Sequence, residues 1–182
     1  RPTGVRDLFS NDGDGTFTVN NNFPDNAATN AQNGNKGGGM FCDFDMDGDL
    51  DIAGGKCPED RARCGSGRYG KKVVWWENPG DGSENWSFHA IGEMPDFGVE
   101  RLVLGDISGD NKPDVVATQE GSNSKDDCDI VWFESPEDPK KNEWKRHKIT
   151  RQGSTFGLDI GDVDGDGDLD ISTGENLVSS AD

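Results

Sequence analysis

Short segments in which apolar residues alternate with polar ones recur along the chain, bounded by glycine, proline or acidic residues. Such alternation over roughly four to eight residues between turn-forming residues is typical of β-strands. Six of these segments flank three acidic loops: residues 39–42, 102–105 and 158–161 precede a loop, and residues 50–53, 113–116 and 169–172 follow one. Each acidic loop is therefore predicted to join two antiparallel strands. No stretch has a sustained helical period with capping residues, so we expect almost no helix.

The chain also repeats itself with a period of roughly 55–65 residues. Residues 73–79 (Val-Val-Trp-Trp-Glu-Asn-Pro) match residues 130–136 (Ile-Val-Trp-Phe-Glu-Ser-Pro) 57 positions later. Residues 86–91 match residues 144–149 with an offset of 58 positions. These segments supply a third and a fourth strand for each repeat. Four antiparallel strands per repeat of this length are typical of a β-propeller blade, so the predicted fold is all-β, with four-stranded antiparallel blades.

The repeats divide the chain into four predicted parts. Residues 1–38 hold the outer two strands of a preceding blade, with a hairpin at Leu8–Phe17, and an Asn- and Gly-rich loop. Residues 39–95 and 96–152 are complete blades, and residues 153–182 are the inner hairpin of a further blade. These parts make about three blade equivalents (half, one, one, half), whereas about 4–8 blades close a propeller.

The further blades have two possible sources. We favour a longer chain of which this sequence is a segment. The alternative is that neighbouring subunits supply them: two copies would make a ring of about six blades, and a head-to-tail arrangement that does not close would grow into a filament. In either case the terminal strands need partners, because exposed strand edges invite pairing.

Composition narrows the possible partners. The chain of 182 residues has 36 Asp and Glu against 18 Lys and Arg, a formal charge of −18, and 30% of its residues are hydrophobic. Such values are also typical of disordered chains, but the regular spacing of the acids and the aromatic strands favour a folded protein. Basic residues do not cluster, so nucleic acid is not expected as a partner. No apolar run approaches the ~20 residues of a spanning helix, so no membrane span is expected in this segment.

The three acidic loops are candidate metal sites. The acids of the first loop alternate over nine positions, at Asp43, Asp45, Asp47, Asp49 and Asp51, and those of the third loop do the same, at Asp162, Asp164, Asp166, Asp168 and Asp170. Side chains at alternate positions of a tight turn point to a common centre, and glycine at the sixth position permits the turn. Several carboxylate oxygens without histidine or cysteine suit Ca²⁺. By analogy with the EF-hand, the seventh position offers its backbone carbonyl, so the side chains of Asp49 and Asp168 rank below the others.

The middle loop has three acids where the other two have five. Its candidate ligands are Asp106, Ser108, Asp110, Lys112 and Asp114. Its lower charge predicts a weaker site, to which Lys112 offers only its carbonyl, so we expect two or three Ca²⁺ ions. A true EF-hand is not predicted, because it requires flanking helices and a glutamate at position 12. The alternative, that the loops are merely solvated acidic turns, is disfavoured because carboxylates at this density repel one another.

The loop and strand motifs resemble a known family. The Asp-x-Asp-x-Asp-Gly-Asp-x-Asp loops, the Asn-Asp-Gly-Asp-Gly-Thr-Phe turn at residues 11–17 and the Trp-Trp/Phe-Glu-Asn/Ser-Pro strands are similar to FG-GAP/VCBS-type repeats, the blades of integrin-α-like propellers. The resemblance covers nearly the whole chain and implies calcium and an extracellular setting, secreted or at the cell surface. It does not imply one activity, since related propellers occur in adhesion receptors, secreted lectins and accessory domains of polysaccharide-degrading enzymes. The calcium ligands that it implies are Asp43, Asp45, Asp47 and Asp51; Asp106, Ser108, Asp110 and Asp114; and Asp162, Asp164, Asp166 and Asp170.

The sequence contains no recognisable catalytic constellation. The two histidines, His89 and His147, occupy the same repeat position, which favours a structural role between strands over acid–base catalysis. Cys42 and Cys128 lack a convincing histidine partner, and no nucleophile elbow, zinc-protease motif or phosphate-binding loop occurs. The tryptophans recur at repeat positions, which favours packing over stacking on sugars; they are Trp75, Trp76, Trp86, Trp132 and Trp144. We therefore expect a protein that is not an enzyme.

Two further features are typical of an exported protein. Cys57 and Cys64 bracket a short polar loop and are predicted to form a disulfide, with free thiols as the alternative. Asn85 begins an Asn-Trp-Ser glycosylation sequon. The non-repeating segments 20–38 and 57–72 are the candidates for binding a protein or glycan ligand. The leading function is a non-enzymatic module for adhesion or structural assembly; the alternative is a carbohydrate-binding lectin or the accessory domain of a polysaccharide-active enzyme.

Overall fold

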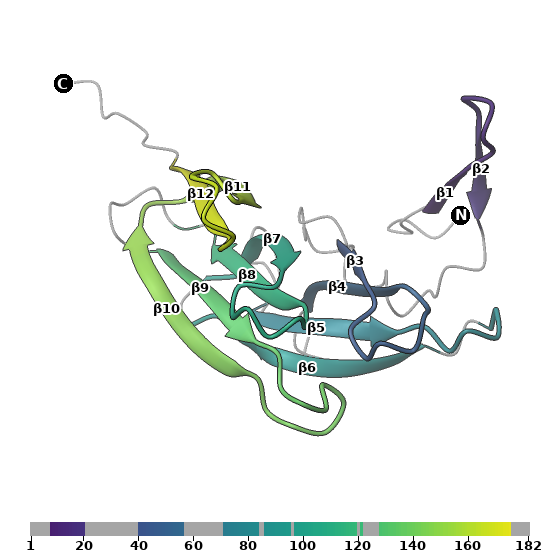
Figure 1. The fold of residues 1–182 in the computed structure, drawn as a ribbon, viewed down its shortest axis with the longest axis horizontal. Helices are drawn as coiled ribbons and strands as arrows, with labels where there is room; N and C mark the ends of the chain where they lie inside the picture. Colours follow the sequence, from purple (N-terminus) through teal and green to yellow (C-terminus); the bar gives the residue numbers. More distant parts are fainter. Residues whose placement is uncertain are drawn as a thin grey trace.

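The computed structural model describes residues 8–20, 40–56, 71–83, 86–95, 97–119, 121 and 128–175. Within these ranges the chain forms twelve β-strands and no helix (Figure 1). The strands are β1 Leu8–Asn11, β2 Phe17–Asn20, β3 Met40–Cys42, β4 Asp51–Lys56, β5 Lys72–Glu77, β6 Ser87–Glu93, β7 Val99–Gly105, β8 Asp114–Gln119, β9 Cys128–Glu134, β10 Lys145–Gln152, β11 Thr155–Gly161 and β12 Asp170–Glu175. The all-β prediction is confirmed, and every acidic loop joins two strands as predicted.

The strands form two four-stranded antiparallel sheets and two separate hairpins. One sheet has the order β3-β4-β5-β6 and the other the order β7-β8-β9-β10, so each strand pairs with its neighbour in sequence. The hairpins are β1–β2 and β11–β12. Equivalent residues take equivalent places: Trp75 pairs with His89 between β5 and β6, and Trp132 with His147 between β9 and β10. The prediction of four antiparallel strands per repeat is therefore confirmed for both complete repeats.

The first strands of successive sheets lie side by side. β3 contacts β7, and β7 contacts β11, so the acidic loop after each first strand occupies the same place in its own sheet. Figure 1 shows the two four-stranded sheets next to each other, with β11–β12 beside β7. Adjacent inner strands are the arrangement found between propeller blades. Among the described residues the sheets do not close into a ring.

The main hydrophobic core lies between the two four-stranded sheets. Successive side chains of a strand face opposite ways, so Trp75 points into this core while Trp76 packs in a second cluster on the other face. Gly92 of β6 allows the sheets to approach, because a Cβ at this position would clash with the buried Phe133 ring. The residues of the main core are Phe44, Ala53, Val73, Trp75, Ile91, Met94, Val99, Leu102, Val115, Ala117, Val131, Phe133 and Trp144.

Phe44, the second residue of the first acidic loop, attaches this loop to the core. Its side chain is 2% exposed, and its ring centroid lies 5.3 Å from that of Trp75 and 5.9 Å from that of Trp144 in the second repeat. Aromatic pairs of this kind contribute about 0.5–1.5 kcal/mol each beyond the area that they bury. The equivalent residue of the third loop, Val163, is 81% exposed, and no sheet of the described residues packs on it. The packing of a loop thus depends on the sheet that comes next.

Replacing these two equivalent residues should therefore have unequal effects. Phe44→Ala is expected to lower the free energy of unfolding by about 3–5 kcal/mol, because it leaves a cavity in the core. Val163→Ala is expected to change it by no more than about 0.5 kcal/mol. Urea unfolding at a fixed calcium concentration measures both, and equal losses would contradict the assignment of Phe44 to the core between the sheets.

Candidate metal centre

Each acidic loop turns sharply between the first and second strands of its sheet. Residues 43–50 join β3 to β4, residues 106–113 join β7 to β8, and residues 162–169 join β11 to β12. At the sixth loop position φ is +100° for Gly48 and +98° for Gly167. Residues with a side chain rarely adopt such a backbone angle, so the turn itself requires these two glycines.

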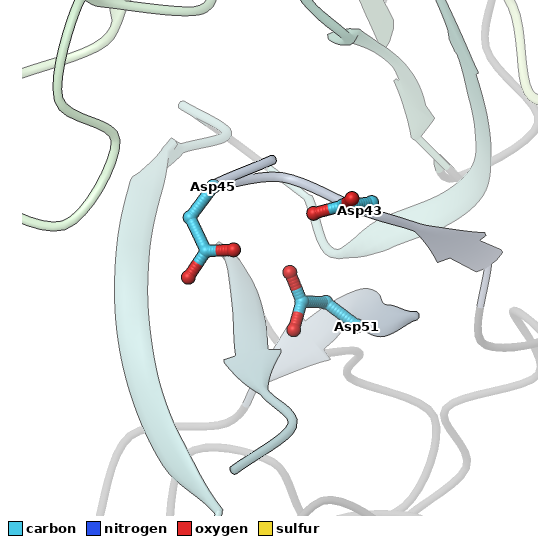
Figure 2. A group of neighbouring side chains, drawn as sticks. All are labelled: Asp43, Asp45 and Asp51. Atoms are coloured by element: carbon cyan, nitrogen blue, oxygen red, sulfur yellow. The ribbon is translucent and has the colours of Figure 1, made fainter. Parts of the chain in front are cut away.

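The first loop brings three carboxylates together. Asp43, Asp45 and Asp51 each place one carboxylate oxygen within 4.8 Å of the other two (Figure 2). Loop amides orient the first of them: Asp47 N donates to Asp43 Oδ1 at 3.1 Å, and Gly48 N donates to Asp43 Oδ2 at 3.0 Å. The turn therefore directs these side chains inward, as a cation-binding loop requires.

The third loop repeats this arrangement. Asp162, Asp164 and Asp166 also place one carboxylate oxygen each within 4.8 Å of the others. Asp162 accepts hydrogen bonds from Gly165 N at 2.7 Å and from Gly167 N at 3.1 Å. All three acids are exposed, whereas those of the first loop are half-buried or buried.

Four predicted ligands of the two outer loops lie outside the two groups of carboxylates. They are Asp47, Asp49, Asp168 and Asp170. Asp47 instead accepts a hydrogen bond from Asp49 N at 3.0 Å, and Asp166 accepts the equivalent bond from Asp168 N at 2.9 Å. Asp49 and Asp168 are the seventh-position residues whose side chains rank lower on sequence grounds. Each outer loop thus brings together three of its five acids.

The ninth-position aspartate ties its loop to the third strand of the same sheet. In both four-stranded sheets this aspartate accepts a hydrogen bond from the amide of the second loop residue at 3.0 Å. It accepts another, at 2.8 Å, from the amide that follows the third strand. That amide belongs to Asn78 in the sheet of Asp51 and to Ser135 in the sheet of Asp114. Burial raises the pKa of Asp51 to about 6, although these hydrogen bonds act in the opposite direction. Burial also raises the pKa of Asp114. A nearby cation would favour the charged form of such a carboxyl group.

The middle loop is partly neutralised by its own lysine. Lys112 Nζ lies 3.0 Å from Asp110 Oδ2 and 3.2 Å from Glu137 Oε2, and these two contacts raise the pKa of Lys112. Asp106 accepts two hydrogen bonds from loop amides, but among the described residues no group of three carboxylates includes it. In the loop with the weakest predicted site, an ammonium group of the loop itself therefore already contacts an acid.

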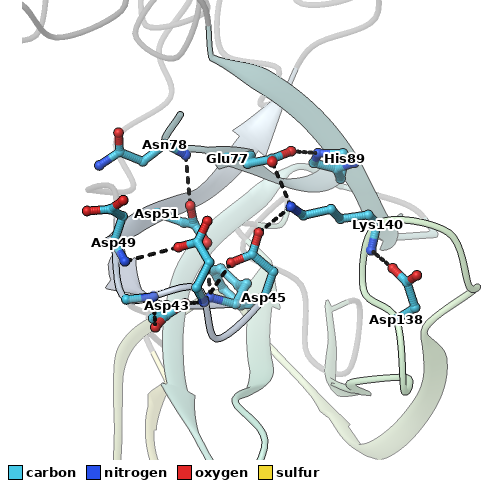
Figure 3. A network of polar contacts seen from close by, with 12 residues as sticks. Asp43, Asp45, Asp49, Asp51, Glu77, Asn78, His89, Asp138 and Lys140 are labelled. Atoms are coloured by element: carbon cyan, nitrogen blue, oxygen red, sulfur yellow. Dashed lines mark hydrogen bonds and ion pairs between the residues drawn. The ribbon is translucent and has the colours of Figure 1, made fainter. Parts of the chain in front are cut away.

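A lysine from the second repeat reaches the first loop. Lys140, between β9 and β10, places Nζ 2.5 Å from Asp45 Oδ2 and 2.6 Å from Glu77 Oε1 (Figure 3). Glu77 Oε2 in turn lies 2.8 Å from His89 Nε2. Burial of the ammonium favours a lower pKa of Lys140, but the contacts with both carboxylates outweigh it and raise this pKa. The comparison of repeats misses this residue, because the aligned position in the first repeat is Ser83.

The first group of carboxylates fits a hard divalent cation. Its donors are all carboxylate oxygens, the type that Ca²⁺ prefers. The Asp45 side chain is 7% exposed, and the described residues supply no donor to its buried Oδ2 other than the Lys140 ammonium. A buried anionic oxygen costs free energy unless a positive charge balances it. The residues that would hold Ca²⁺ are therefore Asp43, Asp45 and Asp51 in the first loop and Asp162, Asp164 and Asp166 in the third.

Both histidines lie between strands, as their repeat position predicts. The His89 ring stacks on Trp75 with centroids 4.5 Å apart, and the His147 ring stacks on Trp132 at 4.0 Å. His147 Nε2 lies 2.6 Å from Glu134 Oε2, which matches the pairing of His89 in the first repeat. Each histidine is thus engaged by an aromatic ring and a carboxylate of its own sheet.

Cys42 does not have the character of a nucleophile. Burial raises the pKa of its thiol to about 11, and the negative charges of Asp43 and Asp51 add to the effect. The thiol therefore stays protonated near neutral pH, whereas the thiolate is the reactive form.

Several predicted features lie outside the described residues. They are the Cys57–Cys64 disulfide, the glycosylation sequon at Asn85, and most of the candidate ligand-binding segments 20–38 and 57–72. These stay predictions from the sequence. In the part of the chain that the structure describes, no helix is long and apolar enough to cross a membrane.

Comparison with known proteins agrees with the repeat motifs. Residues 106–172 match the family model of the FG-GAP-like repeat. Residues 106–172 are accordingly an FG-GAP-like repeat, which confirms the resemblance in the loops and strands of this part of the chain. It is also 35% identical over 85 residues to aldos-2-ulose dehydratase of Phanerodontia chrysosporium. The aligned part covers 44% of this chain and only 9% of that protein.

The difference between the loops predicts which substitution removes a calcium ion. Asp164→Ala takes one of three converging carboxylates from the third loop and should lower the number of bound ions by about one. Ser108→Ala changes the same loop position in the middle loop and should leave that number unchanged. Equilibrium dialysis with radioactive calcium counts the ions, and a loss in Ser108→Ala as large as that in Asp164→Ala would contradict this ranking.

Proposed function

We propose that the chain is a calcium-stabilised segment of an extracellular β-propeller that serves adhesion or structural assembly and catalyses no reaction. The convergence of three carboxylates in each outer loop is the observation that carries this proposal. The acids alternate on a turn whose amides hold the first carboxylate in place, so the site is largely formed before the ion binds. Extracellular calcium is abundant enough to fill sites of modest affinity, which suits an exported protein.

The propeller architecture is supported by the sheet order and by the contacts between repeats. Each complete repeat is a four-stranded meander, and β3, β7 and β11 follow one another as neighbouring first strands. The match to the FG-GAP-like repeat spans the middle loop through the third loop, which is one full period of this arrangement. The chain supplies two complete blades in this proposal, and further blades complete the ring.

Calcium would contribute to stability through the charge of the loops. The chain has a formal charge of −18, and the acidic loops concentrate part of it in short turns. Because a cation that binds only the folded state stabilises that state, each ion would offset the repulsion and the burial of its carboxylates. Burial raises the pKa of Asp51, as expected where desolvation disfavours the charged form of a carboxyl group.

The non-enzymatic role is supported by the partners of the residues that could do acid–base chemistry. Each histidine stacks on a tryptophan and contacts a glutamate, which accounts for its presence in both repeats without a reaction. The thiol of Cys42 has a raised pKa. Adhesion or assembly is the role that the family resemblance adds to these observations.

A second candidate function is a part of a carbohydrate-active protein. The identity to aldos-2-ulose dehydratase favours it, because that protein is an enzyme whose name refers to a sugar derivative. In this case the segment would belong to a longer enzyme or would bind a sugar beside one. The half-buried Trp132 and Trp86 would then be the first aromatic side chains to examine for contact with a sugar ring.

Removal of calcium should lower the melting temperature if the leading proposal holds. A site at 100 times its Kd contributes about 2.7 kcal/mol to the free energy of unfolding, and chelation removes this contribution. Scanning calorimetry in millimolar calcium and in excess EGTA measures the change, with EGTA saturated with calcium as the control. An identical transition in both buffers would contradict a calcium-stabilised fold.

The two candidate functions differ in what the purified chain does with sugars. The adhesion proposal expects no tight binding on a glycan array and no loss of an aldos-2-ulose during incubation in calcium. Chromatography of the sugar before and after incubation measures turnover. Turnover would overturn the non-enzymatic proposal, and tight glycan binding that is lost in Trp132→Ala but kept in Phe88→Ala would favour the second candidate.

A further inference from the structure

The structure points to a regulator of the first loop, an inference that rests on the calcium site proposed above. We propose that Lys140 is a built-in competitor that lowers the affinity of this loop for calcium. The ligands Asp43, Asp45 and Asp51 belong to the first repeat, whereas Lys140 comes from the second. Its ammonium balances the loop when calcium is absent and has to leave Asp45 when calcium binds.

The contact between Lys140 and Asp45 occupies the approach to the most enclosed ligand. Lys140 Nζ lies 2.5 Å from Asp45 Oδ2, a buried atom for which the described residues supply no other donor. The lysine side chain is only 33% exposed, so water screens this contact less than it would at an open surface. An ammonium and a divalent ion a few ångströms apart repel each other strongly, so the two cations exclude each other from this carboxylate.

Glu77 provides a second partner for the displaced ammonium. Lys140 Nζ lies 2.6 Å from Glu77 Oε1, so it can release Asp45 and keep one ion pair. The backbone of the lysine stays fixed, because Asp138 Oδ1 accepts a hydrogen bond from Lys140 N at 3.1 Å. The exchange therefore needs a small movement of one side chain and no rearrangement of the loop. Glu77 also contacts His89 at 2.8 Å, so the exchange changes the surroundings of that histidine.

The three loops differ in the cations that already contact them. Within the described ranges, no lysine or arginine is paired with Asp162, Asp164 or Asp166, whose partners are loop amides. In the middle loop, Lys112 contacts Asp110 at 3.0 Å. The expected order of calcium affinity is therefore the third loop, then the first, then the middle one.

Calcium titration of the full chain tests this role. The substitution Asp164→Ala first silences the third loop, so that the tightest site that calorimetry detects is the first loop. In this background Lys140→Gln should lower the Kd for calcium by about tenfold, because it removes a competing charge from Asp45. Lys141→Gln is the matched control: its side chain is 79% exposed and contacts Asp138 at 2.7 Å, so it should change the Kd by less than about twofold.

The outcomes separate this inference from the proposed function. Unchanged or weaker calcium binding in Lys140→Gln, with binding intact in the parent protein, would overturn the competitor role alone. An absence of calcium binding in the wild-type chain would overturn the calcium site, and the competitor role with it. Circular dichroism of each variant establishes that the comparison is made between folded proteins.

A second measurement uses the wild-type chain and so does not depend on the folding of a variant. During calcium titration followed by NMR, the imidazole signals of His89 should shift as the first loop fills. The signals of His147 serve as the internal control, because its partner Glu134 contacts Lys145 of the same sheet and, within the described residues, no lysine from another repeat. Equal shifts of the two histidines, or a stationary His89 while calcium binds at the first loop, would overturn the competitor role.

Discussion

The buried carboxylate that ends the acidic loop of each four-stranded sheet is the constraint on which the rest of the structure depends. Asp51 and Asp114 each bind the amide of the second loop residue and the amide that follows the third strand. One side chain thereby holds a turn and two strands in register. The cost is a negative charge buried beside other negative charges, and the pKa of Asp51, raised to about 6, reflects that burial. A positive charge near the loop reduces this cost, and the source of that charge differs from loop to loop.

Two of the three loops obtain part of this positive charge from a lysine. Lys112 lies within the middle loop, and Lys140 reaches the first loop from the next repeat. The third loop holds three exposed carboxylates that accept hydrogen bonds only from loop amides among the described residues. Loops that look alike as motifs therefore differ in electrostatics. The difference comes from one or two residues that the motif does not include.

The sequence predicts the strands and loops well because both follow from local patterns. Alternating apolar residues and the repeat offset determine β4, β5 and their equivalents, and the glycines at positions 48 and 167 follow from the positive φ that the turn requires. The contact of Lys140 with Asp45 is not predictable in this way, since it joins residues that are distant in sequence and has no counterpart in the other repeat. Nor do alternating acids reveal that Asp47 and Asp170 lie outside the groups of three, because Asp166, at the loop position of Asp47, belongs to one and accepts the equivalent amide hydrogen bond.

Neighbouring residues of the first loop connect the candidate metal site to the packing between repeats. Phe44 packs on Trp144, and Asp45, the next residue, contacts Lys140; both partners lie in the segment of the second repeat between β9 and β10. An apolar contact and a charge contact thus hold the same two elements together. If an ion replaces Lys140 at Asp45, the charge contact is lost while the apolar one remains, so the ion acts on the interface between repeats as well as on its own turn. In the third loop the residue equivalent to Phe44, Val163, is exposed, so among the described residues this loop has no such apolar contact with a following sheet.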